Sequence, residues 1–315
     1  MSDLSRRHFI LRARALLAFA AAHPWLTFAQ TASAPKTRLI LLGTGGGPRP
    51  RKNSFASSQV ILINGAAYVV DCGNGVAIQL ARAEVSLPSL RHVFITHHHS
   101  DHNADYGNLL LLAWASGLRT RVDAWGPPPL RRMTRLFFEM NAYDINTRIA
   151  DEEKAPLVPL VHAHELTRTG MVMRDDNVTV TCALVDHPPV RHAFAYRFDS
   201  RDRSIVISGD TRRCDALIRL AQGADVLVHE ALYMPAVDRL VARVPNAKRL
   251  KESIVSHHTS AEDAGRVAEA AGVKTLVLSH FVPPDDSTIT EQMWIDSARS
   301  TYKGQIIVGR DLQEI

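Results

Sequence analysis

The sequence lacks the features that mark several special classes of protein. Its 315 residues include three cysteines, Cys72, Cys182 and Cys214, which are too few for a disulfide scaffold. No apolar run reaches the roughly 20 residues that a membrane anchor requires, because Arg12 and Arg14 interrupt the N-terminal apolar stretch. With 46% hydrophobic and 22% charged residues, the composition excludes a disordered chain, a collagen-like repeat and a protein with many membrane spans.

A strong net charge is also absent outside the N-terminus. The whole chain carries +5, of which residues 1–34 contribute +3 through four arginines against Asp3. The remaining +2 is too weak a balance to argue for binding to nucleic acid or to an anionic membrane. We therefore expect no nucleic-acid partner and no stable membrane insertion.

The N-terminal residues are better explained as a targeting signal than as part of the folded domain. The segment Ser5–Leu11, followed by an apolar stretch over residues 13–22, resembles a twin-arginine export signal. This resemblance predicts a signal over residues 1–34 with cleavage near residue 29 or 34. It implies recognition by the twin-arginine export machinery and a periplasmic or secreted protein. The mature domain would then span residues 35–315.

Short apolar strands alternate with helical stretches in the rest of the chain. The Asn64-Gly65 pair between two apolar runs predicts a two-residue hairpin. We find no repeat and no low-complexity linker, so one mixed α/β domain fits better than two. The expected strands cover residues 37–42, 59–63, 67–71, 92–96, 178–185, 193–198, 204–208, 226–228 and 275–278, and the expected helices cover residues 76–83, 130–140, 215–221, 261–271 and 289–300.

The most informative segment follows the expected strand at residues 92–96 and reads T-H-H-H-S-D-H. His97 and His99 point to the same side of an extended strand end, because side chains alternate with a period of two. The turn that follows can bring Asp101 and His102 to a second ion. Imidazole combined with carboxylate suits zinc, manganese or iron. A second H-x-H pattern, at residues 161–165, lacks the Asp-His continuation and is expected to be a solvent-facing strand edge.

The pattern T-H-x-H-x-D-H resembles the metallo-β-lactamase superfamily. That resemblance implies an α/β fold, an αβ/βα sandwich of two mixed sheets flanked by helices, with two metal ions, here two zinc ions, at one edge. Further ligands at strand ends follow in order along the chain. The resemblance assigns His97, His99 and His187 to one ion, Asp101, His102 and His280 to the other, and Asp210 as the bridge between them. His192 is an alternative to His187.

Residues beyond the ligands narrow the resemblance to one branch. His229-Glu230-Ala231, the segment from His258 to Ala264, Trp125-Gly126-Pro127 and Asp71-Cys72-Gly73-Asn74-Gly75 resemble motifs of the ribonuclease Z-like branch. That branch also holds small-molecule phosphodiesterases and arylsulfatases. Ribonuclease Z itself carries a long arm for tRNA between the third histidine and the bridging aspartate, and only residues 188–209 lie there in this chain.

Together these features predict a dinuclear hydrolase of small esters, either phosphodiesters or aryl sulfates, that uses a metal-bound hydroxide. Asp101 would orient the nucleophile. His258, paired with Glu230, would stabilise charge or protonate the leaving group. His229 and Arg212 would support the site or hold an anion. The alternatives are a lactonase and a non-hydrolytic accessory protein of cofactor biosynthesis with the same fold.

Three further points stay open at the level of sequence. The segment at residues 233–251 is expected to cover the site and decide specificity. Members of the branch often dimerise, so a homodimer is possible. Whether Cys182 and Cys214 pair is not determined by their spacing.

Overall fold

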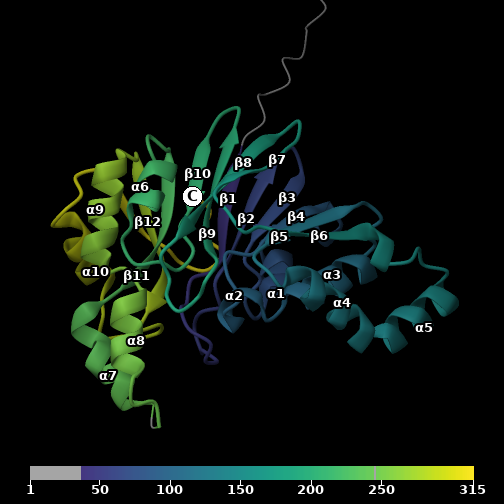
Figure 1. Cartoon of the computed structure of the whole chain (residues 1–315), viewed down its shortest axis with the longest axis horizontal. Coiled ribbons are helices and arrows are strands. Elements are labelled where there is room, and N and C mark those ends of the chain that lie inside the picture. The colour runs from purple at the N-terminus through teal and green to yellow at the C-terminus, as the bar shows by residue number, and fades with distance from the viewer. Residues whose placement is uncertain (1–36, 245) are drawn as a thin grey trace, which may run out of the picture. The chain divides into compact units, whose positions relative to one another are not determined.

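The computed structural model describes residues 37–244 and 246–315, and the two sheets of that part are shown in Figure 1. The predicted export signal at residues 1–34 lies outside the described residues. Among the helices that are described, none has the length and apolar character needed to cross a membrane.

The first sheet has six strands in sequential order. Its first three strands are antiparallel, and β2 and β3 meet in a tight turn where Asn64 and Gly65 have φ angles of 52° and 78°, as the Asn-Gly pair predicts. From β3 onward the strands are parallel and are connected through helices. The bounds are β1 (Arg38–Gly43), β2 (Ser58–Ile63), β3 (Ala66–Val70), α1 (Val76–Arg82), β4 (Leu90–Phe94), α2 (Ser100–Asn103), α3 (Tyr106–Ala115), β5 (Val122–Gly126), α4 (Leu130–Met140), α5 (Ala142–Glu152) and β6 (Val161–Glu165).

The second sheet has seven strands in the order β13-β12-β11-β10-β9-β8-β7. The strands β7 to β10 are antiparallel, whereas β10 to β13 are parallel, so this sheet is mixed as predicted. The bounds are β7 (Gly170–Arg174), β8 (Val178–Val185), β9 (Ala193–Ser200), β10 (Ser204–Ile207), α6 (Asp215–Leu220), β11 (Val226–Leu232), α7 (Val237–Ala242), α8 (Leu250–His257), α9 (Ala261–Ala271), β12 (Thr275–Val282), α10 (Glu291–Arg299) and β13 (Gln305–Val308).

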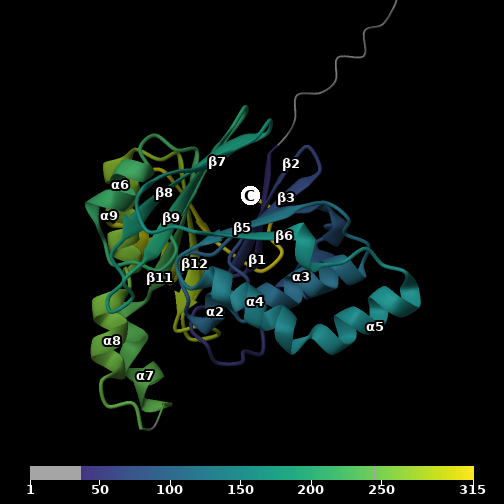
Figure 2. The same ribbon diagram turned by 45° about the vertical axis from the view of Figure 1, so that its right-hand side comes forward.

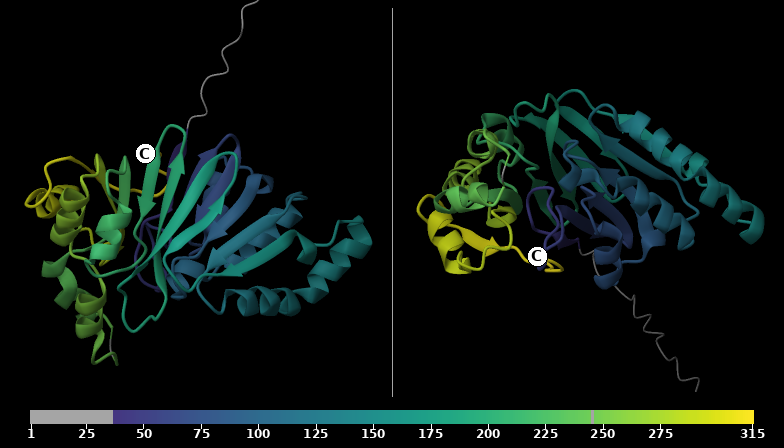
Figure 3. Two further views of the ribbon diagram at one scale, coloured as in Figure 1. Left: turned by 45° about the horizontal axis from the view of Figure 1, so that its top comes forward. Right: turned by 90° about the horizontal axis from the view of Figure 1, so that it is seen from below.

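Three apolar cores hold these layers together. The middle core joins the facing surfaces of the two sheets, where the ring of Phe94 in β4 lies 5.1 Å from that of Phe198 in β9. One outer core packs α1, α3 and α4 on the first sheet, and the other packs α6, α9 and α10 on the second. Figures 2 and 3 show these helices on the outer faces. The order helix, sheet, sheet, helix confirms the expected αβ/βα sandwich.

The parallel strands place chemistry at one edge. Parallel strands end on the same side of a sheet, and loops after those ends are the usual place for a site in α/β folds. His97 follows β4, Asp210 follows β10, and His280 lies near the end of β12. The edge that carries the carboxyl ends of these strands is therefore where the predicted ligands converge.

Candidate metal centre

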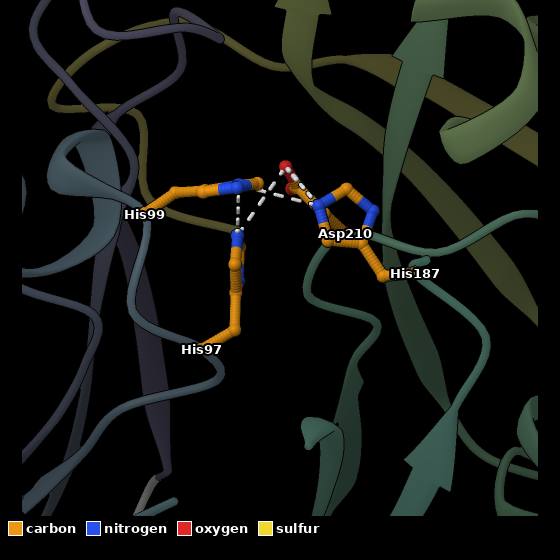
Figure 4. Close-up of side chains that lie close together, drawn as sticks. All are labelled: His97, His99, His187 and Asp210. Carbon is orange, nitrogen blue, oxygen red and sulfur yellow. Dashed lines mark hydrogen bonds and ion pairs between the residues drawn. The ribbon is translucent and has the colours of Figure 1, made fainter. Parts of the chain in front are cut away.

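The first group of predicted ligands is assembled as expected. Nε2 of His97 lies 2.9 Å from Nδ1 of His99, which lies 3.3 Å from Nε2 of His187. Oδ2 of Asp210 lies 3.8 Å from His97 and 4.0 Å from His187. Figure 4 shows the four side chains pointing toward one point, and their ligand atoms all lie within 4.8 Å of one another.

The second group lies on the other side of Asp210. Nε2 of His280 is 3.1 Å from Nε2 of His102 and 3.2 Å from Oδ2 of Asp101. Oδ1 of Asp210 lies 3.3 Å from both imidazoles, whereas its Oδ2 faces the first group. One carboxylate thus faces two clusters with different oxygens, which is the geometry of a bridging ligand.

Local backbone structure aims these side chains. The strand β4 ends just before His97, and the short helix α2 then turns Asp101 and His102 back toward the centre. In β12, His280 is an extra residue between the paired residues Ser279 and Phe281 and has a φ of 45°. Such a bulge re-aims a side chain at the cost of strain. Gly46 makes room, because a Cβ there would lie 2.7 Å from Nδ1 of His280.

Buried partners fix which nitrogen of His102 and of His187 faces the centre. His102 donates from Nδ1 to Oδ2 of Asp71 at 2.7 Å, and His187 donates from Nδ1 to the carbonyl of His257 at 3.0 Å. With a cation bound, each of these two rings would present the lone pair of Nε2 to it. The motif around Asp71 indicates the branch of the superfamily, but the motif alone does not reveal the contact with His102. The signal of Asp71 is its position at the end of β3, beside the end of β4.

The donor set fits cations. Nε2 of His97 and Nε2 of His187 lie 2.9 Å and 3.3 Å from Nδ1 of His99, so three imidazole nitrogens converge as they would around one cation. Burial lowers the pKa of His187 to about 4, so this ring is neutral, as a metal ligand must be. Burial alone would raise the pKa of Asp101, but the nearby His102 and His280 lower it well below its usual value. Oδ1 of Asp210 is buried without a hydrogen-bond partner among the described residues.

Next to the ligand groups lies a pair of residues suited to proton transfer. Nδ1 of His258 lies 2.6 Å from Oε2 of Glu230 and 3.8 Å from Oδ2 of Asp210. The backbone N–H of Thr211 donates to Oε1 of Glu230 at 2.6 Å. Burial alone would lower the pKa of His258, but the Glu230 carboxylate raises it to about 9. Burial raises the pKa of Glu230. The structure thus brings together the pair that the sequence motifs singled out.

Two predicted supporting residues lie outside the ligand groups. Arg212 forms an exposed ion pair with Asp186 at 2.6 Å, because the backbones of these residues bridge in antiparallel fashion. His229 is fully buried, and its Nδ1 contacts the carbonyl of Glu230 at 2.9 Å. Side chains alternate along β11, so His229 points away from the face that Glu230 occupies. Neither side chain lines the pocket over the ligand groups, and the supporting roles expected for His229 and Arg212 stay predictions.

Several secondary expectations can be compared with the structure. The H-x-H pattern at residues 161–165 forms β6, an edge strand, as predicted. His98 points away from the ligand groups and lies 2.7 Å from the carbonyl of Pro127. His187, and not His192, belongs to the ligand groups. All three cysteines are free, so Cys182 and Cys214 do not pair in this structure.

A pocket of about 260 Å³ opens above the ligand groups. Its floor includes Asp101, Asp210 and His258. One wall is formed by the glycine-rich loop that follows β1, at residues 46–49. The helices α7 and α8 form the opposite wall, so the segment expected to cover the site does so in part. The remaining lining residues on that wall are Leu240, Leu250, Ser253 and Ile254.

Comparisons with known proteins agree with this geometry. Residues 67–281 match the model of the Beta-lactamase superfamily domain. The chain is 35% identical over 279 residues to Ribonuclease Z of Mycobacterium sp. (strain KMS), which covers 88% of this chain and 95% of that protein. Among solved structures, the metallo-β-lactamase fold protein YhfI from Bacillus subtilis has a TM-score of 0.66 at 19% identity, covering 89% of this chain and 99% of that one. Human tRNase Z, short form, has a TM-score of 0.64 at 21% identity, covering 88% and 98%.

These relatives overturn the expectation of small ester substrates and of no nucleic-acid partner. The mycobacterial protein is named a ribonuclease, and ribonucleases act on RNA. The expectation rested on the weak net charge and on the absence of a long segment between His187 and Asp210. However, the 279 matched residues are 95% of the mycobacterial protein, which leaves little room for such a segment there either. The short connection therefore does not exclude an RNA substrate.

Three observations together assign the chain to a family. They are the order of the ligands along the chain, the convergence of these ligands at one sheet edge, and the match over most of the domain. The chain belongs to the metallo-β-lactamase superfamily and, within it, to the ribonuclease Z-like branch.

Proposed function

We propose that this protein is a metal-dependent ribonuclease that hydrolyses a phosphodiester bond in RNA of the tRNA-precursor class. The observation that carries this proposal is the bridging geometry of Asp210 between two ligand groups, next to the His258–Glu230 pair. The name of the mycobacterial relative supports the choice of RNA as substrate. Imidazole and carboxylate ligands with buried hydrogen-bond partners favour two zinc ions.

Different residues of the chain would have different roles in the hydrolysis. Two divalent cations held by the ligand groups would supply Lewis acidity and lower the pKa of water toward neutrality. Asp101 accepts the N–H of Gly47 at 2.7 Å, which holds this carboxylate beside the second group. Attack of water on phosphorus breaks the bond to the leaving ribose oxygen. His258, protonated at neutral pH, lies where it can give its proton to that oxygen, and Glu230 holds its ring in place.

The rim of the pocket suits a polyanion. Arg49 lines the pocket, and the neighbouring residues Arg51 and Lys52 belong to the same loop. Arg51 donates to the carbonyl of Gly46 at 3.2 Å, so part of this loop is fixed in position. Cations beside the candidate centre would neutralise the phosphates that flank the cleaved bond.

The test is cleavage of an RNA hairpin with a single-stranded 3′ tail by the purified, metal-loaded protein. We expect cleavage at one junction, loss of cleavage after chelation, and recovery when zinc is restored. A metal-loaded protein that leaves this RNA and a tRNA precursor intact would contradict the proposal. A parallel reaction with Asp210→Ala protein shows whether cleavage depends on the candidate centre.

A further inference from the structure

Positive charge is concentrated in a short stretch over the candidate metal centre. Residues 237–257, which comprise α7, α8 and their connection, contain five arginines and lysines against two acidic residues, a net of +3. Residues 35–315 carry +2 in all, so the remainder of that range is slightly acidic. The near-neutral average hides a local excess of cations, and a local excess is what attracts a polyanion. We call α7, α8 and the described residues between them the basic hairpin.

The basic hairpin is oriented with its apolar side toward the site. Leu240 and Ile254 line the same pocket as Asp210 and His258. Ile254 also packs with Val237 and residues of β11 and β12 in a small apolar cluster. Figures 1 and 2 show α7 and α8 side by side, projecting beyond the end of the second sheet. The charged side chains are therefore left on the outer surface, and Arg239, Arg243, Lys248, Arg249 and Lys251 are all exposed.

Three of these cations are not held in a buried ion pair. Arg249 pairs with Glu252 at 3.0 Å and is 83% exposed, and an exposed pair of this kind contributes little to stability. Arg243 and Lys248 have no ion pair among the described residues. Successive phosphate groups of a nucleic acid could therefore contact these three residues without breaking a buried interaction.

From this placement we propose that Arg243, Lys248 and Arg249 contact the phosphate backbone of the RNA substrate beside the cleavage position. The inference rests on the proposed function and adds a substrate-binding surface to it. Contacts to phosphates position a nucleic acid without reading its bases. The basic hairpin would thus strengthen binding of any RNA that reaches the pocket, to a similar degree for different sequences.

The experiment compares two matched triple variants of the metal-loaded protein. The test variant is Arg243→Gln with Lys248→Gln and Arg249→Gln. The control variant is Arg38→Gln with Arg121→Gln and Lys274→Gln, which also removes three exposed cations. These control residues lie at the starts of β1, β5 and β12, away from the strand ends that carry the site. The measurement is KM for the tailed RNA hairpin between low and physiological KCl.

We expect the test variant to raise KM at least about 10-fold at low salt and to reduce the slope of log KM against log salt by about 2 to 3, since each lost phosphate contact removes roughly 0.7 to 0.9. The control variant should match the unmodified protein. If both triple variants behave alike, the inference is wrong although the proposed function stands. If the unmodified protein does not cleave RNA, the proposed function itself fails. If the test variant does not fold, the single variants Arg243→Gln and Lys248→Gln are compared with the unmodified protein in the same measurement.

Discussion

Nδ1 of His258 lies 2.6 Å from Oε2 of Glu230, and the other oxygen of that carboxylate accepts the backbone N–H of Thr211. Thr211 directly follows Asp210, so one buried carboxylate joins the candidate proton donor to the loop of the bridging ligand. The same contact raises the pKa of His258 to about 9, against the opposing effect of burial.

This pair predicts the alkaline limb of the pH profile. The protonated form of His258 is the proton donor, and its population falls as pH rises through about 9, so kcat should fall above that pH. His258→Ala should lower kcat by about 100- to 10,000-fold, the usual range for a general acid, and should remove the alkaline limb. Glu230→Gln should move the limb to lower pH, because it removes the negative charge that raises the pKa. An unchanged limb in both variants would exclude His258 as the donor.

The position of Asp210 predicts how metal content responds to substitution. Asp210→Ala should reduce the bound metal of both ligand groups, because its two oxygens face different groups. His187→Ala should affect the first group alone. His192→Ala serves as the control and should keep full occupancy. Metal analysis after dialysis measures these differences, and an Asp210→Ala protein with full metal content would show that it is no bridge.

The contact between Asp71 and His102 predicts a role for a residue outside the ligand set. Asp71→Asn preserves the size of the side chain but removes the charge that holds Nδ1 of His102 protonated. We expect about a 10- to 100-fold loss of metal affinity, as is usual when the hydrogen-bond partner of a ligand is removed. Competition with a coloured chelator measures the affinity. Retained affinity with altered thermal stability would instead indicate that Asp71 only supports the fold.

The export prediction for residues 1–34 remains to be tested in cells. A reporter that becomes active only outside the cytoplasm should be exported when fused to these residues. Replacing Arg6 and Arg7 with lysine should abolish export if the twin-arginine machinery recognises them. Export that survives this change would exclude that route. Retention of the fused reporter in the cytoplasm would remove the export prediction altogether.

Much of the candidate centre was predictable because its residues are local in sequence or follow apolar strands. The segment from His97 to His102 contains four predicted ligands, and the order of these ligands can be read directly from the sequence. The β2–β3 hairpin follows from Asn64-Gly65, whose positive φ angles match the turn that this pair favours. These features depend on short-range chemistry, which a single sequence retains.

Other features depend on contacts that no local pattern records. Arg212 follows the bridging aspartate in sequence, but a backbone bridge places it against Asp186 instead. The helix α3 was not predicted, because its run of four leucines shows little separation of apolar and polar faces. The substrate class was misjudged because a net charge averages over the whole surface. It does not record that the basic hairpin gathers cations at one place.

His257 is the last residue of α8 and therefore belongs to the basic hairpin. Its carbonyl accepts the hydrogen bond from Nδ1 that holds the ring of His187. Movement of the hairpin on binding RNA would turn or release a ligand of the first group. Substrate affinity and metal affinity would then be thermodynamically linked, and linkage is reciprocal. The free energy by which bound RNA changes metal affinity would equal the free energy by which bound metal changes RNA affinity.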